Sequence, residues 1–227
     1  MTGRSQLVTA KAGETRQRIL EAALRLFRER GFEKTTMRDV AAAAGVATGA
    51  AYYYFRSKEE VVLAFYAGTA EEMRALLPPE LKRTKDLRKR LHRILELKLI
   101  QLQPHRPVLS FLFRSAIDPT SPLSPFSAGN RSIRDETVGW FRDAIETSSE
   151  TIPKELEGFL PELLWMYEMG LILFFLYDHS PEQKRTYRLL DGTLDIMIKA
   201  LRLSRLPLLG PMRRSVASLL RDVGVDG

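Results

Sequence analysis

Three consecutive tyrosines, Tyr52–Tyr54, are the side chains of this sequence whose placement most needs a chemical explanation. Consecutive residues of a helix point about 100° apart, so three adjacent phenols cannot all face one protein core. At least one phenolic hydroxyl therefore faces outward, where it can donate a hydrogen bond to an acceptor such as a phosphate oxygen. Gly49 and Ala50 precede the tyrosines and leave room for a close approach to another surface.

The tyrosines fall in the second of two short predicted helices. Thr36 precedes a helix over residues 37–44, and Asp39 stands three positions later, which is the pattern of a capping box. Gly45 ends that helix, and a further short helix over residues 47–55 follows. Two short helices joined by a tight turn have the spacing of a helix-turn-helix motif, in which the second helix enters the DNA major groove.

This motif gives each outward residue of the second helix an expected role. Gly49 and Ala50 stand at its N-terminal end, where small side chains allow a close approach to base edges. Tyr52 and Tyr54 lie further along, where phenolic hydroxyls reach the flanking phosphates. Lys58, in the first turn of the next helix, adds an ammonium group to the same phosphates. We therefore expect duplex DNA to be the partner of this segment.

The charge distribution agrees with a nucleic-acid partner. The 227-residue chain carries a formal net charge of +7. Residues 1–58 hold 11 Lys and Arg against five Asp and Glu, so most of the positive excess lies in the first quarter of the chain. This excess is smaller when the counted segment extends to residue 60, because Glu59 and Glu60 are then included. A basic cluster attracts the phosphate backbone without specifying a base sequence.

The residues needed for other chemistries are missing from the sequence. No cysteine occurs, which removes disulfides and thiolate metal ligands. His92, His105 and His179 are far apart in the sequence, so we expect no metal site. Neither a phosphate-binding glycine loop nor a nucleophile elbow is present, so an enzyme is the weaker hypothesis and we expect no cofactor.

Hydrophobic periodicity indicates helices along nearly the whole chain. Residues 15–30 place apolar side chains on one stripe, and Gly31 ends that helix. Ser57 begins a helix that Pro78 and Pro79 end. No segment has the alternation of a strand, so we predict an all-α protein. Further helices are expected over residues 84–103, 107–117, 131–147, 160–178, 181–204 and 211–223.

The chain lacks the patterns of a secreted or membrane protein. Its first 14 residues have no apolar core of a secretory signal. The most apolar stretch, Met169–Tyr177, is too short to span a bilayer, and Glu162 and Glu168 interrupt a longer one. We therefore expect a cytoplasmic protein with no membrane partner, and keep a basic peripheral membrane protein as a competing hypothesis.

Residues 15–62 resemble the DNA-binding domain of TetR-family transcriptional regulators. The motifs that carry the resemblance are A-x-x-L-F-x-x-x-G-F, T-T-M-R-D-V-A, G-V-A-T-G, Y-Y-Y-F and S-K-E-E. The resemblance implies an all-α homodimer that usually represses transcription until a small molecule binds its C-terminal domain. It implies a flexible N-terminal arm over residues 1–14, a three-helix helix-turn-helix domain over 15–62, and a ligand-binding and dimerisation domain over 63–227.

The resemblance implies DNA roles on both helices of the motif, and several residues keep a second interpretation. Thr36 is either a helix cap or a phosphate contact, and Arg38 is either a contact or a solvated charge. Ala47 and Thr48 stand where relatives often have serine and lysine, so Thr48 either caps the helix or contacts DNA. Tyr53 either only packs on the first helix or has a mixed role, in which it packs there and also reaches DNA. The predicted DNA-binding residues are Thr36, Arg38, Thr48, Gly49, Ala50, Tyr52, Tyr53, Tyr54 and Lys58.

Helices 160–178 and 181–204 are the expected dimer interface. The first is apolar nearly all round and needs cover on more than one side, whereas the second is amphipathic. The resemblance implies that these two long helices form a four-helix interface, and a palindromic operator requires two reading units. The alternative is that both helices only complete the core of a monomer.

An effector pocket is expected among helices 84–103, 107–117, 131–147 and 160–178. Their apolar and aromatic content favours a hydrophobic or amphipathic effector, although each candidate residue has ordinary packing as its alternative. The candidates are His92, Phe111, Phe113, Arg114, Trp140, Phe141, Trp165, Tyr167 and Met169. The arginines after Ser204 receive no role, and the sequence does not distinguish a repressor from an activator.

Overall fold

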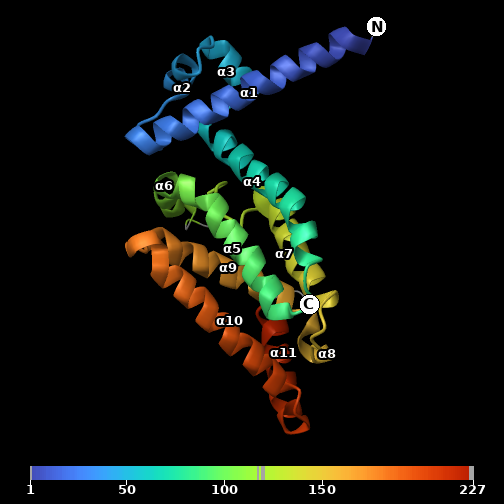
Figure 1. The fold of residues 1–227 in the computed structure, drawn as a ribbon. Helices are drawn as coiled ribbons and strands as arrows, with labels where there is room; N and C mark the ends of the chain where they lie inside the picture. The colour runs from blue at the N-terminus through green and yellow to red at the C-terminus, as the bar shows by residue number, and fades with distance from the viewer. Residues whose placement is uncertain (1, 117, 119–120, 225–227) are drawn as a thin grey trace. The chain divides into compact units, whose positions relative to one another are not determined.

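The computed structural model describes residues 2–116, 118 and 121–224, and these ranges fold into helices joined by turns and loops (Figure 1). No strand occurs within them, which agrees with the all-α prediction. The α-helices are α1 Thr2–Arg30, α2 Met37–Ala43, α3 Thr48–Tyr54, α4 Lys58–Leu81, α5 Leu87–Leu102, α6 Arg106–Ala116, α7 Arg131–Glu146, α8 Lys154–Glu157, α9 Leu160–Tyr177, α10 Lys184–Ser204 and α11 Gly210–Asp222.

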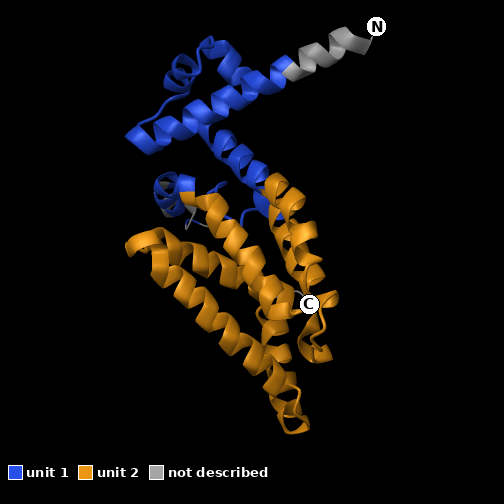
Figure 2. Ribbon diagram, in the orientation of Figure 1, with its two compact units in different colours: residues 1–69, 104–131 blue, residues 70–103, 132–227 orange. Residues whose placement is uncertain are grey.

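The chain divides into two compact units (Figure 2). The first comprises residues 1–69 and 104–131, and the second comprises residues 70–103 and 132–227. α4 therefore runs from the first unit into the second, and α6 belongs to the first. Each unit has a core of its own, and each positions a different candidate site.

The core of the first unit forms where three helices meet. α1 contributes Ile19 and Phe27, which are fully buried because they recur on one face of the helix. Val40 of α2 and Ala51 of α3 are also fully buried, and α2 contacts both α1 and α3. Because Ala51 holds one side of α3 inward, the tyrosine-bearing side of that helix is free to face outward.

The first helix is longer than predicted. α1 begins at Thr2, so the expected start at residue 15 is wrong. Gly3 and Gly13 lower helix propensity, but no proline stands between residues 2 and 14 to stop the helix. A local pattern of apolar residues marks only the part of a helix that packs on a core, and therefore underestimates its length.

α4 also continues beyond its predicted end. Pro78 and Pro79 lie inside the helix, which ends only at Leu81. Each proline removes one N–H donor but keeps a helical φ, so the last turn survives at the cost of two backbone hydrogen bonds. Lys82 N donates to the carbonyl oxygen of Pro78 at 3.3 Å and completes that turn.

The start of α10 differs from the prediction as well. Ser180 and Pro181 have the pattern of a helix start, yet the regular helix begins at Lys184. A 3-10 turn precedes it, in which Glu182 and Gln183 have φ angles of 54° and 53°. Two consecutive left-handed residues interrupt the helical path, so the α-helix cannot begin at the proline.

The buried carboxylate of Asp178 holds this segment together. Its Oδ2 accepts from the backbone N–H and the hydroxyl of Thr186, at 2.9 Å and 2.8 Å, and its Oδ1 accepts from Ser180 N at 2.9 Å. Burial raises the pKa of Asp178, but the hydrogen bonds from Ser180 and Thr186 outweigh it and hold that pKa well below its ordinary value.

We expect Asp178→Ala to lower the free energy of unfolding by about 1–3 kcal/mol, because the buried N–H and hydroxyl of Thr186 lose their acceptor. The wild-type advantage should be present above about pH 4 and should be lost as the pH falls through the depressed pKa of the folded state. Urea titrations at neutral and acidic pH measure this. Asp222→Ala at the exposed end of α11 is the control, and equal stability of the two variants would contradict the assignment.

The second unit is built from α5, α7, α9 and α10, with α11 added at its C-terminal side. α5 contacts both α9 and α10, and Phe141, Phe175 and Leu190 are fully buried. Phe159 and Ala217 form a smaller cluster that joins α11 to the start of α9. The short helix α8 was not expected from the sequence, since four residues show no periodicity.

Two of the tail arginines have structural partners. Arg205 Nη1 lies 2.8 Å from Glu150 Oε1. Arg213 Nη1 donates to the carbonyl oxygens of Ser204 and Leu206, at 2.5 Å and 3.1 Å, where α10 ends. These arginines thus satisfy helix C-terminal carbonyls and a carboxylate, as cations near helix C-termini commonly do.

α9 is the one helix in the described ranges that is long and apolar enough, by length and composition only, to be a candidate for crossing a membrane. Its 18 residues include Glu162 and Glu168, so the helix is longer than the apolar stretch picked out in the sequence. Core helices of soluble proteins meet the same criterion, and α9 packs on α5 and α10.

Candidate nucleic-acid interface and the interior of the second unit

The turn between α2 and α3 is held by its own backbone. Gly45 has a φ of 66°, a left-handed conformation that favours glycine. The N–H of Val46 donates to the carbonyl oxygen of Ala41 at 3.0 Å, which closes the turn. This local chemistry sets α3 at a defined angle to α2, as the predicted helix-turn-helix requires.

Thr36 is the cap of α2. Its Oγ accepts from Asp39 N at 3.2 Å, while its own N–H donates to Asp39 Oδ2 at 2.9 Å. The Thr36 hydroxyl also donates to Asp39 Oδ2 at 2.6 Å, and these bonds lower the pKa of the Asp39 carboxyl. The capping interpretation is therefore confirmed, and the hydroxyl proton is already engaged.

α3 presents small residues and phenols on its outward side. Thr48 and Gly49 are exposed at its first turn, and Ala50 is half-buried. Tyr53 is 83% exposed, so the interpretation in which it packs on the first helix is wrong, and Tyr52 is 49% exposed.

Tyr54 is half-buried beside Tyr53. The two rings meet edge to face, with their centroids 5.2 Å apart. That contact stiffens the C-terminal end of α3 and orients both phenols.

The N-terminus of α3 has no side-chain cap. Ala47 occupies the N-cap position, and Thr48 is the first helical residue, so capping by Thr48 is wrong. Alanine has no acceptor atom, which leaves the first N–H groups of the helix without a side-chain partner. Arg38 is exposed on α2 and stays a predicted contact.

Lys58 lies in an unexpected setting. Its Nζ donates to the carbonyl oxygens of Phe32 and Glu33, at 2.9 Å and 3.4 Å, and stands 4.3 Å from the ring centroid of Phe32. The ammonium also lies 3.8 Å from Glu33 Oε2. Lys58 thus ties the start of α4 to the turn after α1, and its predicted phosphate contact requires the ammonium to leave these partners.

The structure separates the predicted effector residues into two groups. Trp140, Phe141 and Trp165 are buried in the second unit, and Met169 is half-buried. Phe113 is half-buried in α6, which belongs to the first unit. The side chains of Phe111 and Arg114 lie outside the described residues.

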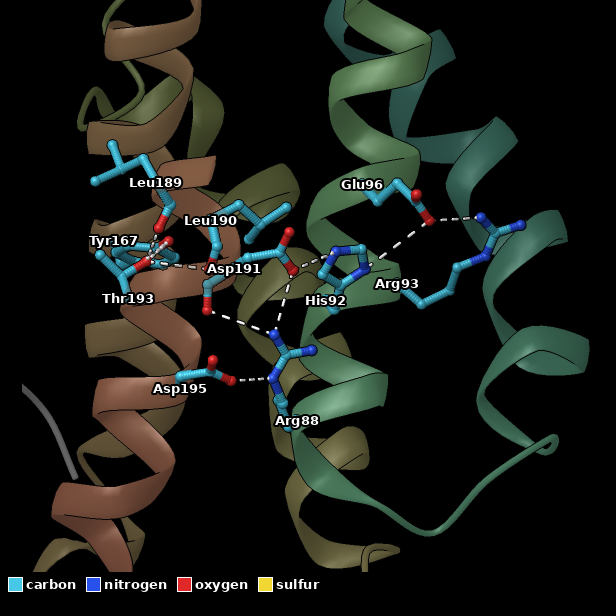
Figure 3. Close-up of polar contacts among 10 residues, drawn as sticks. All are labelled: Arg88, His92, Arg93, Glu96, Tyr167, Leu189, Leu190, Asp191, Thr193 and Asp195. Atoms are coloured by element: carbon cyan, nitrogen blue, oxygen red, sulfur yellow. Dashed lines mark hydrogen bonds and ion pairs between the residues drawn. The ribbon is translucent and has the colours of Figure 1, made fainter. Parts of the chain in front are cut away.

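His92 belongs instead to a polar seam between α5 and α10 (Figure 3). Its Nε2 lies 3.3 Å from Asp191 Oδ1, and Arg88 bridges Asp191 and Asp195 on the same seam, at 3.2 Å and 2.5 Å. His92 thus lies at the polar contact between α5 and α10, and its side chain does not point into the interior of the second unit.

Tyr167 also points to α10 and not to the interior (Figure 3). Its hydroxyl lies 2.5 Å from Thr193 Oγ, and Thr193 donates to the carbonyl oxygen of Leu189. Desolvation by partial burial raises the pKa of Tyr167, against the effect of the Thr193 hydrogen bond.

The sequence-based predictions lack several buried charged residues, among them a pair on α5 and α9. Glu168 of α9 is 1% exposed, and Lys98 of α5 is 9% exposed. Lys98 Nζ lies 5.6 Å from the ring centroid of Trp140. A sequence signal exists, since Glu168 interrupts an apolar helix, but by itself this pattern only argues against a membrane span.

Burial changes the acidity of both groups. Burial raises the pKa of Glu168 to about 7, and the positive charge of Lys98 only partly offsets this. Burial also lowers the pKa of Lys98, against the attraction of Glu168. Each group therefore carries a desolvation cost that its neighbour does not fully remove.

We expect the double replacement Lys98→Met with Glu168→Met to raise the free energy of unfolding by about 2 kcal/mol, because apolar side chains of similar length remove both desolvation costs. Denaturant unfolding of the purified proteins measures this. Lys89→Met with Glu162→Met, on the more exposed positions of α5 and α9, is the matched control. A strongly destabilised double variant would show that the pair stabilises the fold.

α9 and α10 each carry an exposed apolar face. On α9, Phe174 and Tyr177 are 40% and 57% exposed. On α10, Ile196 and Leu203 stand seven residues apart on one face and are more than half exposed. Apolar side chains gathered on neighbouring exposed faces are typical of a protein interface.

A cleft lies at the junction of these two helices. Its cavity volume is about 430 Å³, and it contains none of the predicted effector residues. It is lined by Phe174, Tyr177, Asp178, His179, Ser180, Pro181 and Arg185.

Two family models match the chain. Residues 19–65 match the model described as bacterial regulatory proteins, tetR family, and residues 90–217 match the model described as tetracyclin repressor-like, C-terminal domain. The second match covers more than half of the chain, and the first covers the candidate DNA-binding helices.

Individual relatives agree with these matches. The HTH-type transcriptional regulator TtgR of Pseudomonas putida is 50% identical over 55 residues, which are 24% of this chain and 26% of that protein. The alignment thus spans about a quarter of that relative.

Solved structures show the same fold. The structure of FadR from Thermus thermophilus, a TetR-family repressor in complex with lauroyl-CoA, has a TM-score of 0.53 at 19% identity and covers 81% of this chain and 92% of that one. The SmeT–triclosan complex has a TM-score of 0.62 at 20% identity and covers 82% of this chain and 91% of that one.

Proposed function

Because this chain belongs to the TetR family of bacterial transcriptional regulators, we propose that it represses transcription from a palindromic operator until a hydrophobic or amphipathic small molecule releases it. The observation that carries the proposal is the outward face of α3. There Gly49 is exposed ahead of two exposed tyrosines, on a helix whose opposite side is anchored by fully buried Ala51.

The proposed contacts follow from this face. The first turn of α3 approaches base edges, because Gly49 has no side chain to hold the helix away. Exposed Tyr52 and Tyr53 donate to phosphates together with half-buried Tyr54, and exposed Arg38 on α2 adds a positive charge at the same groove. Thr36 takes part only through its position, since its hydroxyl is engaged by Asp39.

We propose that α9 and α10 form the interface of a homodimer. Their exposed apolar side chains supply a surface that water disfavours, and a two-fold interface places two copies of α3 on successive turns of DNA. Homodimers of this kind are typical of the family. A plain monomer would leave these faces in water and would read only half of a palindrome.

An effector acts by binding one dimer arrangement better than the other. A ligand shifts the equilibrium only by the difference between its affinities for the two arrangements. Ligand complexes of neighbours, FadR with lauroyl-CoA and SmeT with triclosan, support an apolar or amphipathic effector for this chain too. The proposed location of the protein is the cytoplasm, where DNA is accessible.

The test is selection of genomic DNA fragments by the purified protein at two salt concentrations. A recovered palindrome that binds less tightly at the higher salt concentration supports the proposal, because Lys and Arg contacts to phosphates release counterions. Salt-sensitive binding without sequence preference contradicts specific readout. Binding to anionic vesicles in place of duplex DNA supports the membrane hypothesis instead. Transcription assays from the recovered promoter then distinguish a repressor from an activator.

A further inference from the structure

Glu168 occupies a position where the fold calls for an apolar side chain. The buried face of α9 also carries Leu164, Trp165, Leu171 and Phe175, at the spacing of one helical stripe. Glu168 stands in the middle of that stripe and is 1% exposed. Sequences break their own hydrophobic pattern mainly at functional sites, which makes this carboxylate a candidate for binding.

One oxygen of this carboxylate is not satisfied by the residues that the structure describes. Its Oε2 is buried and has no hydrogen-bond partner among the residues that the structure describes. Buried acceptors without a partner are rare in native proteins, because each one forfeits its hydrogen bonds to water. A group that a bound molecule supplies would remove this deficit.

The charges around Glu168 decide which group fits. Lys98 interacts electrostatically with Glu168, and also with Glu136 and Glu72. A cationic ligand would compete with the Lys98 ammonium for Glu168, and an anionic ligand would place a second negative charge beside the buried Glu168 carboxylate. A neutral hydrogen-bond donor is repelled neither by the Lys98 ammonium nor by the Glu168 carboxylate.

Two indole rings flank the buried charges. Trp165 stands one helical turn before Glu168 on α9, and the ring of Trp140 on α7 lies beside the Lys98 ammonium. Both rings are buried. Buried aromatic side chains beside a buried hydrogen-bond acceptor suit an apolar ligand that carries one polar group.

We propose that the effector is a neutral hydroxyl compound, an alcohol or phenol on an apolar body, whose O–H donates to Glu168 Oε2 between α5, α7 and α9. This inference rests on the proposed function, since it names the chemistry of the effector site. It adds the anchor residue and the class of polar group, which the apolar character of the helices alone does not specify.

The chain offers a direct optical readout. It has two tryptophans, Trp140 and Trp165, and both flank the proposed site. Intrinsic fluorescence therefore reports on binding there without a label. The probes are para-hexylphenol and para-hexylanisole, which share their apolar body but differ in the O–H donor. Para-hexylbenzylamine tests a cation, and para-hexylbenzoate tests an anion.

The wild-type protein is expected to bind the phenol about tenfold more tightly than the anisole, since one hydrogen bond to a charged acceptor distinguishes them. Titrations at about pH 8 keep Glu168 ionised. The amine and the benzoate are expected to bind more weakly than the phenol. Equal affinity for phenol and anisole, or tightest binding of either charged probe, would overturn the proposal.

Variants locate the effect at Glu168. Glu168→Met should reduce the preference for phenol over anisole to within about twofold, because the acceptor is gone. Glu168→Gln keeps the shape and a weaker neutral acceptor, so it should show an intermediate preference even if the methionine variant does not fold. Glu162→Met and Glu162→Gln, in the first turn of the same helix, are the matched controls and should keep the full preference. A preference that survives both changes at Glu168 would also overturn the proposal.

DNA binding by the same preparations separates this inference from the proposed function. A protein that binds its selected DNA but shows no phenol preference refutes the hydroxyl effector and leaves the regulator intact. Loss of phenol-induced release from DNA in Glu168→Met, with DNA affinity itself unchanged, supports both. A protein that does not bind DNA refutes the proposed function, whereas the fluorescence titration still reports on Glu168.

Discussion

Replacing Gly49 with glutamate is expected to weaken operator binding at least about 100-fold, because it places a negative charge where we propose that α3 meets the phosphates and base edges of DNA. Placing like charges against one another at an interface costs several kcal/mol, which corresponds to this change in affinity. The new side chain also removes the space that lets the helix approach the groove floor.

The fold should tolerate the same change. Gly49 is exposed, and a Cβ built on it meets no atom within 4 Å. Its φ lies outside the positive range, and glutamate has a higher helix propensity than glycine, so the thermal midpoint should stay the same or rise slightly. Loss of binding would therefore come from the interface and not from unfolding.

Fluorescence anisotropy with the selected operator measures the effect. Gly68→Glu is the matched control, because Gly68 is an exposed helical glycine of α4 with the same open surroundings and lies away from α3 in the sequence. The control should lose little affinity. If Gly49→Glu bound the operator as tightly as the wild type, α3 would not be the reading helix.

Replacing Ile196 with arginine is expected to raise the dimer dissociation constant more than about 100-fold. Ile196 is 67% exposed at the middle of α10, on the face that also carries Leu203. A two-fold interface contains every residue twice, so one substitution buries two guanidinium groups that have no partner. The free-energy cost of burying two unpaired charges exceeds the stabilisation that a few apolar contacts give the dimer.

Sedimentation equilibrium measures the dissociation constant directly. Ile100→Arg is the control, because Ile100 is 51% exposed on α5, outside the proposed interface. Operator affinity should fall together with dimerisation in Ile196→Arg and should persist in the control. A dimeric Ile196→Arg protein would place the subunit contact elsewhere.

Local signals explain the parts of the fold that could be predicted. The cap of α2 by Thr36, the turn at Gly45 and the burial of Ala51 depend on residues within a few positions of one another. Hydrogen bonds and φ preferences at this range leave a readable pattern in the sequence. The helix-turn-helix and its outward tyrosines therefore follow from the amino acids themselves.

Helix ends were predicted less well, because competing interactions decide them. A serine–proline pair favours a helix start at 181. In the structure Thr186 donates hydrogen bonds to Asp178, and the two residues Glu182 and Gln183 between them are left-handed, so the α-helix begins later. Pro78 and Pro79 remain inside α4 since the helix regains its bonding within one turn. The position of a helix end depends on the sum of several small interaction energies, and no single sequence motif predicts that sum.

The sequence by itself determined the helical class, the reading motif and the apolar character of the second unit, because these depend on periodicity and on neighbours along the chain. Only the tertiary structure decided the partners of distant charges. It placed Lys58 on the turn after α1, His92 on a seam with α10, and Glu168 in an apolar interior beside Lys98. The energy of a charge depends on its burial and on groups far away in the chain, so residue type alone cannot assign its role.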